Sequence, residues 1–188
     1  MKEKLEIINR LYNTNETVSL LALDELRQRG WLTDGTLKGH MLCNLYLRGA
    51  NLKDACLVSV DFHQIHLEWA NLSYANLQNA KLTRANLSGS NLDQTDLKNA
   101  DLYKANFRNA LNLTSEQLQR AKRLWGAIMP DGEAYDGRYN LPADLELARW
   151  NNLDLHDPQA MADFYGVPLQ RYLEHASTEV AIPRLNIS

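Results

Sequence analysis

Every fifth residue from Leu37 to Phe107 is leucine or phenylalanine, without exception over fifteen positions. A period of five matches neither an α-helix, with 3.6 residues per turn, nor a β-strand, in which side chains alternate. A Leu- and Ala-rich helix would spread these leucines around its whole circumference and leave many of them in water. The chain must therefore turn once in each five residues, so that every leucine returns to a shared interior.

A second position of the repeat supports this interpretation. A small residue stands two places before each later member of the series, at Ala70, Ala75, Ala80, Ala85, Ser90, Thr95, Ala100 and Ala105. One large and one small residue per repeat therefore face inward, and three polar residues face solvent. The predicted structural core consists of Leu52, Leu57, Phe62, Leu67, Leu72, Leu77, Leu82, Leu87, Leu92, Leu97, Leu102 and Phe107.

The triplets Ala70-Asn71-Leu72 and Ala100-Asp101-Leu102 resemble the A-(D/N)-L-x-x unit of the pentapeptide-repeat family, in particular its bacterial, cyanobacterial-like members. The resemblance implies an all-β solenoid core, a right-handed quadrilateral β-helix with four repeats per coil. Four sides imply a period of twenty residues. The bulky exceptions at the small position fall into two adjacent columns at that period, His40 with Val60 and Leu45 with Ile65.

Both ends of such a stack leave backbone groups and apolar side chains uncovered, so the flanking segments are expected to act as caps. We expect an N-terminal helical cap at residues 1–34, the β-helix at 35–112, a C-terminal capping helix at 113–129 and a helical C-terminal extension at 130–188. Asn15 is the predicted N-cap of a helix near 16–29, which follows another near 3–12. The spacing of Thr114 and Gln117 predicts a capping box.

Short helices are expected in the extension near 143–150, 158–165 and 168–175. The segment Phe164-Tyr165-Gly166-Val167-Pro168 and the pair Tyr172-Leu173 resemble an extension found on bacterial pentapeptide-repeat proteins.

Composition excludes several classes of protein. The formal net charge of −3 gives no electrostatic reason to bind a polyanion, and two cysteines cannot form a disulfide scaffold. No apolar stretch is long enough to span a bilayer, and the N-terminal residues lack the apolar core of a secretory signal. A cytoplasmic protein without nucleic-acid or membrane partners is therefore expected.

Residues capable of catalysis do not converge in this pattern. A Leu/Ala-filled interior has no pocket, and no phosphate loop, zinc-ligand cysteine pair or nucleophile elbow is present. His63 and His66 straddle a corner, while Cys43 and His63 share one outward column, where a thiol–imidazole contact is conceivable. We predict no catalytic residues, no metal, no cofactor and no enzymatic activity.

The strongest candidate site is a surface patch around Trp69. In the four-sided arrangement Trp69 stands between Gly49 and Gly89, neither of which can shield its ring. The predicted partner-binding residues are Trp69, Tyr46, His66, Arg48, Glu68 and Tyr74. Exposed aromatic and arginine side chains are typical of interface centres. Burial of Trp69 under a cap or the tail of the same chain is the alternative, which we favour slightly.

Two further functions are weighed and disfavoured. Some pentapeptide-repeat proteins mimic duplex DNA and bind DNA gyrase, which requires an acidic rod, yet residues 35–112 hold eight Lys/Arg against six Asp/Glu. The tail also has helix-turn-helix-like spacing, but residues 113–188 carry seven Lys/Arg against eleven Asp/Glu, which would repel phosphates.

The sequence therefore predicts a non-enzymatic interaction or scaffold protein that presents flat β-helix walls to an unknown protein partner. Homodimerisation through the C-terminal extension is a further prediction.

Overall fold

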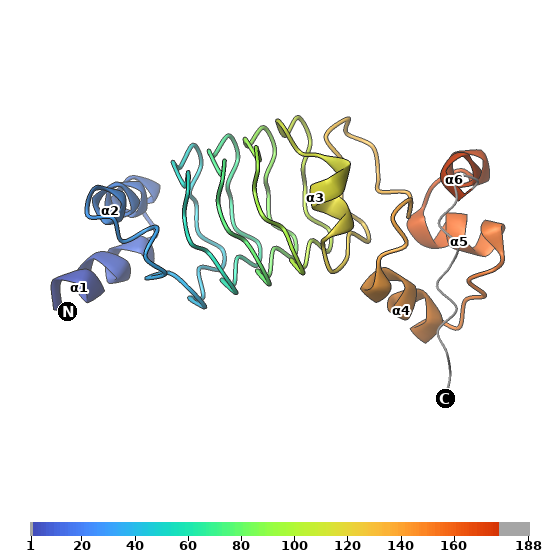
Figure 1. Cartoon of the computed structure of the whole chain (residues 1–188), viewed down its shortest axis with the longest axis horizontal. Coiled ribbons are helices and arrows are strands. Elements are labelled where there is room, and N and C mark those ends of the chain that lie inside the picture. Colours follow the sequence, from blue (N-terminus) through green and yellow to red (C-terminus); the bar gives the residue numbers. More distant parts are fainter. Residues whose placement is uncertain (1, 177–188) are drawn as a thin grey trace.

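The computed structural model describes residues 2–176; Met1 and residues 177–188, which hold the end of the predicted extension, lie outside the described part. A stack of coils occupies the middle of an elongated molecule, with helices α1 and α2 at one end and α4 to α6 at the other (Figure 1).

Two helices cover the N-terminal end of the stack. Helix α1 spans Lys2–Leu11 and α2 spans Glu16–Gln28, close to the predicted ranges. The Asn15 side chain accepts a hydrogen bond from the Thr17 amide, as the N-cap prediction requires. The inward faces of both helices belong to the same apolar core as the leucines of the coils, so the pair acts as a lid.

Parallel bridges between residues twenty apart define the coils. The pairs Met41–Asp61, Tyr46–His66, Asn51–Asn71 and Cys56–Asn76 start four columns, one for each wall. The chain therefore returns to the same wall after four repeats. Within residues 2–176 the β-structure consists of isolated single-residue bridges, parallel between coils and antiparallel between Ile128 and Ala134, because a corner interrupts each wall before an extended strand can form.

Each corner depends on one left-handed residue. From Gly39 to Asn109, the second residue after every large core position has a positive φ. Asn and Gly tolerate this conformation best, and both recur there. Each corner turns the chain from one wall onto the next, and the hydrogen bonds between coils continue through it.

The interior is filled as the period of five predicts. Each of the twelve predicted core residues is at most 1% exposed, and Val60 and Ile65 are fully buried at the N-terminal end. Ser90 and Thr95 satisfy their buried hydroxyls on the backbone carbonyls of Leu87 and Leu72, at 2.7 and 2.8 Å.

The predicted capping helix at 113–129 is wrong in extent. Helix α3 spans only Ser115–Gln119, and the bridges Asp101–Arg123 and Asn106–Ile128 show that the stack continues beyond residue 112. The bridge spacing becomes 22 instead of 20, so the segment that contains α3 adds two residues to the last coil. Leu124, Ala127 and Met129 continue the inward pattern after the insertion.

The C-terminal module closes the other end. Its helices are α4 (Pro142–Trp150), α5 (Pro158–Tyr165) and α6 (Leu169–Ala176), close to the three predicted segments. Tyr135, Leu141, Leu145 and Met161 join the core of the coils. The module thus packs on the coils of its own chain, and homodimerisation through it stays a prediction.

Candidate functional site

The wall that carries Trp69 at its edge has a polar, flat surface. Its outward column consists of Asn51, Asn71, Asn91 and Leu111, bridged in that order. We call this surface, with its two flanking corners, the asparagine wall. The Asn51, Asn71 and Asn91 side chains each accept a hydrogen bond from the amide two residues later, which holds the amide groups rigid.

Trp69 occupies one corner of the asparagine wall and is 70% exposed. Its φ of 58° is the left-handed conformation that bulky residues rarely adopt. A Cβ on Gly89 would lie 2.5 Å from the indole Cδ1, so the ring lies directly on this glycine. The favoured prediction that a cap or the tail buries Trp69 is therefore wrong. Helices α1 and α2 and helices α4 to α6 lie at the two ends of the stack (Figure 1).

Tyr74 occupies the other corner of the same wall. It is 53% exposed and also left-handed, with φ 61°. The Lys53 ammonium lies 5.7 Å from its ring centroid. Trp31 and Trp125 likewise carry cations of the same chain, whereas no such contact is found for Trp69 within residues 2–176.

The other predicted aromatic pair lies on the neighbouring wall. The Tyr46 and His66 rings stack with centroids 4.3 Å apart and an interplanar angle of 10°. His66 Nδ1 lies 3.2 Å from Glu68 Oε1, and Asn86 donates to the same oxygen at 2.7 Å. Glu68 Oε2 is buried and lacks a hydrogen-bond partner among the described residues.

Arg48 has a structural partner. Its Nε and Nη2 donate to the two carboxylate oxygens of Glu16 at 3.1 and 2.8 Å, and its backbone amide donates to Glu16 Oε1 at 3.0 Å. The hydrogen bonds from the Arg48 side chain are the main reason why the pKa of Glu16 is lowered, and the bond from the Arg48 amide acts in the same direction. Arg48 thus ties α2 to the first coil, at the edge of the predicted patch.

Cys43 hydrogen-bonds to Asp61 instead of to His63. Its thiol donates to Asp61 Oδ1 at 3.2 Å, and the His63 amide donates to the same carboxylate oxygen at 3.1 Å. Burial, followed by the bond to Asp61, raises the pKa of the Cys43 thiol. A thiol that resists ionisation is a poor nucleophile.

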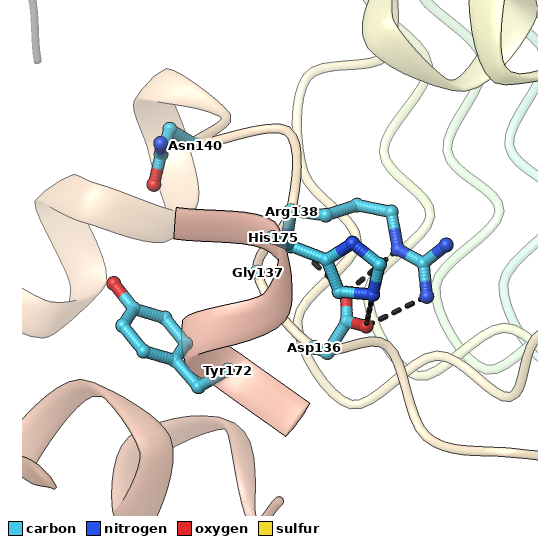
Figure 2. A pocket seen from close by; sticks show the side chains of 6 residues that line it. All are labelled: Asp136, Gly137, Arg138, Asn140, Tyr172 and His175. Carbon is cyan, nitrogen blue, oxygen red and sulfur yellow. Dashed lines mark hydrogen bonds and ion pairs between the residues drawn. The ribbon is translucent and has the colours of Figure 1, made fainter. Parts of the chain in front are cut away.

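A charged cluster fastens α6 to the loop after the last coil. Figure 2 shows the buried Asp136 carboxylate facing Arg138 and His175. Arg138 donates to it at 2.8 and 2.6 Å, His175 Nε2 lies 3.2 Å away, and Arg171 Nε lies 3.4 Å away. Burial raises the pKa of Asp136, but the bonds from Arg138 outweigh it and the net shift is downward. The cluster holds α6 in place, and Asp136, Arg138 and His175 line a small pocket together with Tyr172.

Residues 2–176 contain no group of three or more His, Cys, Asp and Glu side chains arranged to hold a metal ion. No helix in the same range is long and apolar enough to cross a membrane.

Comparison with known families identifies the repeat. Residues 59–89 and 80–110 match the family model described as pentapeptide repeats, which is found in eight copies. Residues 59–110 of this chain are pentapeptide repeats. No curated protein matches the chain.

Three solved structures of pentapeptide-repeat proteins are similar. HetL from the cyanobacterium Nostoc sp. strain PCC 7120, involved in heterocyst differentiation regulation, is 34% identical over 50% of this chain and 43% of its own, with a TM-score of 0.46. A protein from the Arabidopsis thaliana thylakoid lumen is 21% identical over 60% and 74%, with a TM-score of 0.46. Rfr23 from the cyanobacterium Cyanothece 51142 is 32% identical over 46% and 58%, with a TM-score of 0.31. The chain spans less than two thirds of the length of HetL and of Rfr23.

Two polar residues that close the pentapeptide-repeat domain were missed by sequence reasoning. Asp144 of α4 accepts a hydrogen bond from the Leu124 amide on Oδ2 and one from the Trp125 amide on Oδ1, both at 3.0 Å. Gln117 of α3 donates to the carbonyls of Leu92 and Thr95 at 2.8 and 2.9 Å. The capping box predicted for Gln117 is present, but its contacts with the stack had no local signal.

Proposed function

We propose that this chain is a non-enzymatic protein-interaction protein that binds its partner on the asparagine wall. The observation that carries the proposal is Trp69, which stays 70% exposed on a rigid corner. A right-handed quadrilateral β-helix, the form that the family implies, and a cytoplasmic location complete the proposal.

The composition of the wall supports a protein partner. Interface centres are enriched in tryptophan, tyrosine and arginine, and a few such anchors supply most of the binding free energy. Trp69 and Tyr74 stand at the two edges of one flat surface, with amide side chains between them. A partner could bury both rings at once.

Rigidity favours binding as well. The wall amides are bonded between coils, as at Asn71 to Ala50 and Asn91 to Ala70, both 2.9 Å. Because these groups are already ordered, little conformational entropy is lost when a partner docks.

Charge argues against a DNA-mimic that acts on gyrase. The eight Lys/Arg and six Asp/Glu between residues 35 and 112 produce a slightly basic surface, where mimicry of DNA requires an acidic one. A supercoiling assay should therefore show neither inhibition of gyrase nor protection from its inhibitors.

The test is photocrosslinking in the native host. A crosslinking amino acid placed at 69 or 74 should trap one and the same protein, whereas placement at Asn79 should not. Asn79 is a matched control, because it is an exposed left-handed corner residue of the same coil, lies diagonally opposite Trp69 and does not border the asparagine wall. Equal capture from position 79, or capture at 74 that survives Trp69→Ala unchanged, contradicts the proposal.

A further inference from the structure

The hydrogen bonds between coils follow one rule along the asparagine wall. The amide of each outward residue donates to a carbonyl of the preceding coil, 21 residues earlier: Asn71 to Ala50, Asn91 to Ala70 and Leu111 to Ser90. The first coil has no predecessor. Its amides on this side therefore point toward the N-terminal helices.

The chain fills one of the open places at this end. The Cys56 amide donates to the Leu32 carbonyl at 2.7 Å, whereas no acceptor is found for the Met41 and Tyr46 amides among the described residues. The Asn51 amide, the first of its wall, has no acceptor within residues 2–176. An exposed edge of this kind is a template for backbone pairing with another chain.

A groove lies at this place, between α2 and the first coil. It has a volume of about 290 Å³ and is lined by Leu20 and Leu23 of α2 and by Gly49, Ala50 and Asn51 of the coil. A side chain at Gly49 would meet no atom within 4 Å, so the coil side is open. Asp24 and Arg27, which also line the groove, pair with each other, so the groove carries no net charge and combines polar with apolar surface.

We propose that this groove receives an extended segment of the protein partner, which adds the missing rung to the asparagine wall. A backbone carbonyl of that segment accepts the Asn51 amide, and a small or medium apolar side chain lies against Leu20 and Leu23. Main-chain bonds supply affinity and the groove supplies selectivity, as in other cases of strand addition.

The inference rests on the proposed function, because the groove and Trp69 belong to one surface. Gly49 occupies the same corner column as Trp69, one coil earlier, and Ala50 and Asn51 begin the wall that Ala70 and Asn71 continue. A partner that covers Trp69 therefore reaches the groove by crossing a single coil.

The test uses NMR on the isotope-labelled full chain, with a synthetic peptide copying residues 84–90 (RANLSGS), a typical wall segment, as the probe. In the free protein the Asn51 amide should exchange quickly with solvent, while the Asn71 amide is protected. Addition of the peptide should shift the Asn51 amide signal and slow its exchange. A scrambled peptide is the control.

Two variants separate the backbone from the side chain. Asn51→Pro removes the N–H and should weaken peptide binding about tenfold, the loss expected for one hydrogen bond. Asn51→Ala keeps the N–H and should bind as the wild type does. Trp69→Ala should also bind the short peptide normally, because the peptide occupies only the groove. Failure of peptide binding therefore tests the groove, and failure of crosslinking at position 69 tests the proposed function.

Several results would overturn the inference: an Asn51 amide already protected in the free protein, no shift with peptide up to its solubility limit, or equal binding by Asn51→Pro. Protection of Asn51 that disappears on dilution would show that a second copy fills the groove, and would also overturn the assignment to a different partner.

Discussion

Trp69 and Tyr74 hold a conformation that suits Asn or Gly better. A left-handed residue with a Cβ costs about 1–2 kcal/mol, and Asn lowers this cost by bonding locally. Both aromatic residues have φ near 60°. Neither ring is buried, so the stability of the fold gives no reason for their presence at these corners.

Replacement of Trp69 by asparagine should therefore leave stability intact or improve it. We expect Trp69→Asn to raise the free energy of unfolding by up to about 1 kcal/mol, while abolishing partner capture. Urea unfolding measures the first effect. A loss of more than about 1 kcal/mol would mean that the indole stabilises the coil through its contact with Gly89. Asn79→Ala is the control, because it measures the effect of removing asparagine from another left-handed corner.

Asp144 is a buried carboxylate whose ionisation opposes folding. Burial raises its pKa to about 6 from the ordinary 3.8, although the Leu124 and Trp125 amides and Arg123 act in the opposite direction. The folded protein therefore holds a proton that the unfolded chain releases. The stability gained from this proton is complete below about pH 4 and is lost as the pH rises through about 6.

Comparison of the wild type with Asp144→Asn isolates this effect. The full difference between the two pKa values corresponds to about 3 kcal/mol. Wild-type stability relative to the variant should fall between pH 4.5 and 7.5, as measured by urea unfolding at each pH. Other carboxylates such as Asp136 titrate equally in both proteins, so parallel pH profiles would refute the raised pKa.

Among the elements, α3 replaces part of a wall, and its Gln117 side chain supplies a hydrogen bond that the wall would otherwise provide. The helix interrupts the ladder, so the carbonyl of Thr95 lacks the amide that a regular coil would provide. The Gln117 side chain supplies a donor to it at 2.9 Å and a second one to Leu92 at 2.8 Å. Its Oε1 also accepts the Thr114 amide in the capping box.

Gln117→Ala should consequently destabilise the protein by about 2–3 kcal/mol, because it removes these bonds and leaves the partly buried Thr95 carbonyl unpaired, while the Leu92 carbonyl keeps the Thr95 amide as its donor. Gln119→Ala is the matched control, since Gln119 lies exposed in the same helix. Chemical denaturation of the two variants side by side is the measurement. Equal, small effects would show that water replaces Gln117 as the donor to the Thr95 carbonyl.

For the whole molecule, one apolar core runs from α1 through the coils to the C-terminal module. The core includes Ile7 and Leu11 at one end and Met161 and Val167 at the other. Neighbouring repeats in a solenoid stabilise one another through their shared faces. A stack this short, closed at both ends, should therefore unfold as a single unit.

Fluorescence of two single-tryptophan variants can test this cooperativity. Trp31 reports on the N-terminal cap and Trp125 on the last coil, and both are partly buried. In each variant the other tryptophans are replaced by phenylalanine. Urea unfolding is followed in each variant by tryptophan fluorescence, which reports on one end, and by circular dichroism, which reports on the whole chain. The two methods should give the same midpoint within each variant. Separate midpoints within one variant, detected by fluorescence and circular dichroism, would show that an end unfolds first.

Some predictions failed where an insertion or an irregular residue hid the period. Met129 and Ala127 continue the repeat after α3, but two inserted residues and a methionine broke the match to the earlier series. Sequence reasoning correctly placed Trp69 in a column with Gly49 and Gly89. It could not tell whether another segment of the chain covers the ring.

The amino-acid sequence by itself determined the coil, because a leucine every five residues can be buried only if the chain turns at that interval. It also determined the two helices of the N-terminal cap, through the N-cap residue Asn15 and their apolar faces. Only the tertiary structure decided what lies outside the coil: which carboxylate meets which amide, where the stack ends, and that Trp69 stays open. Those contacts join residues far apart in the chain, such as Gln117 with Leu92 and Asp144 with Leu124, and they depend on packing that no local pattern records.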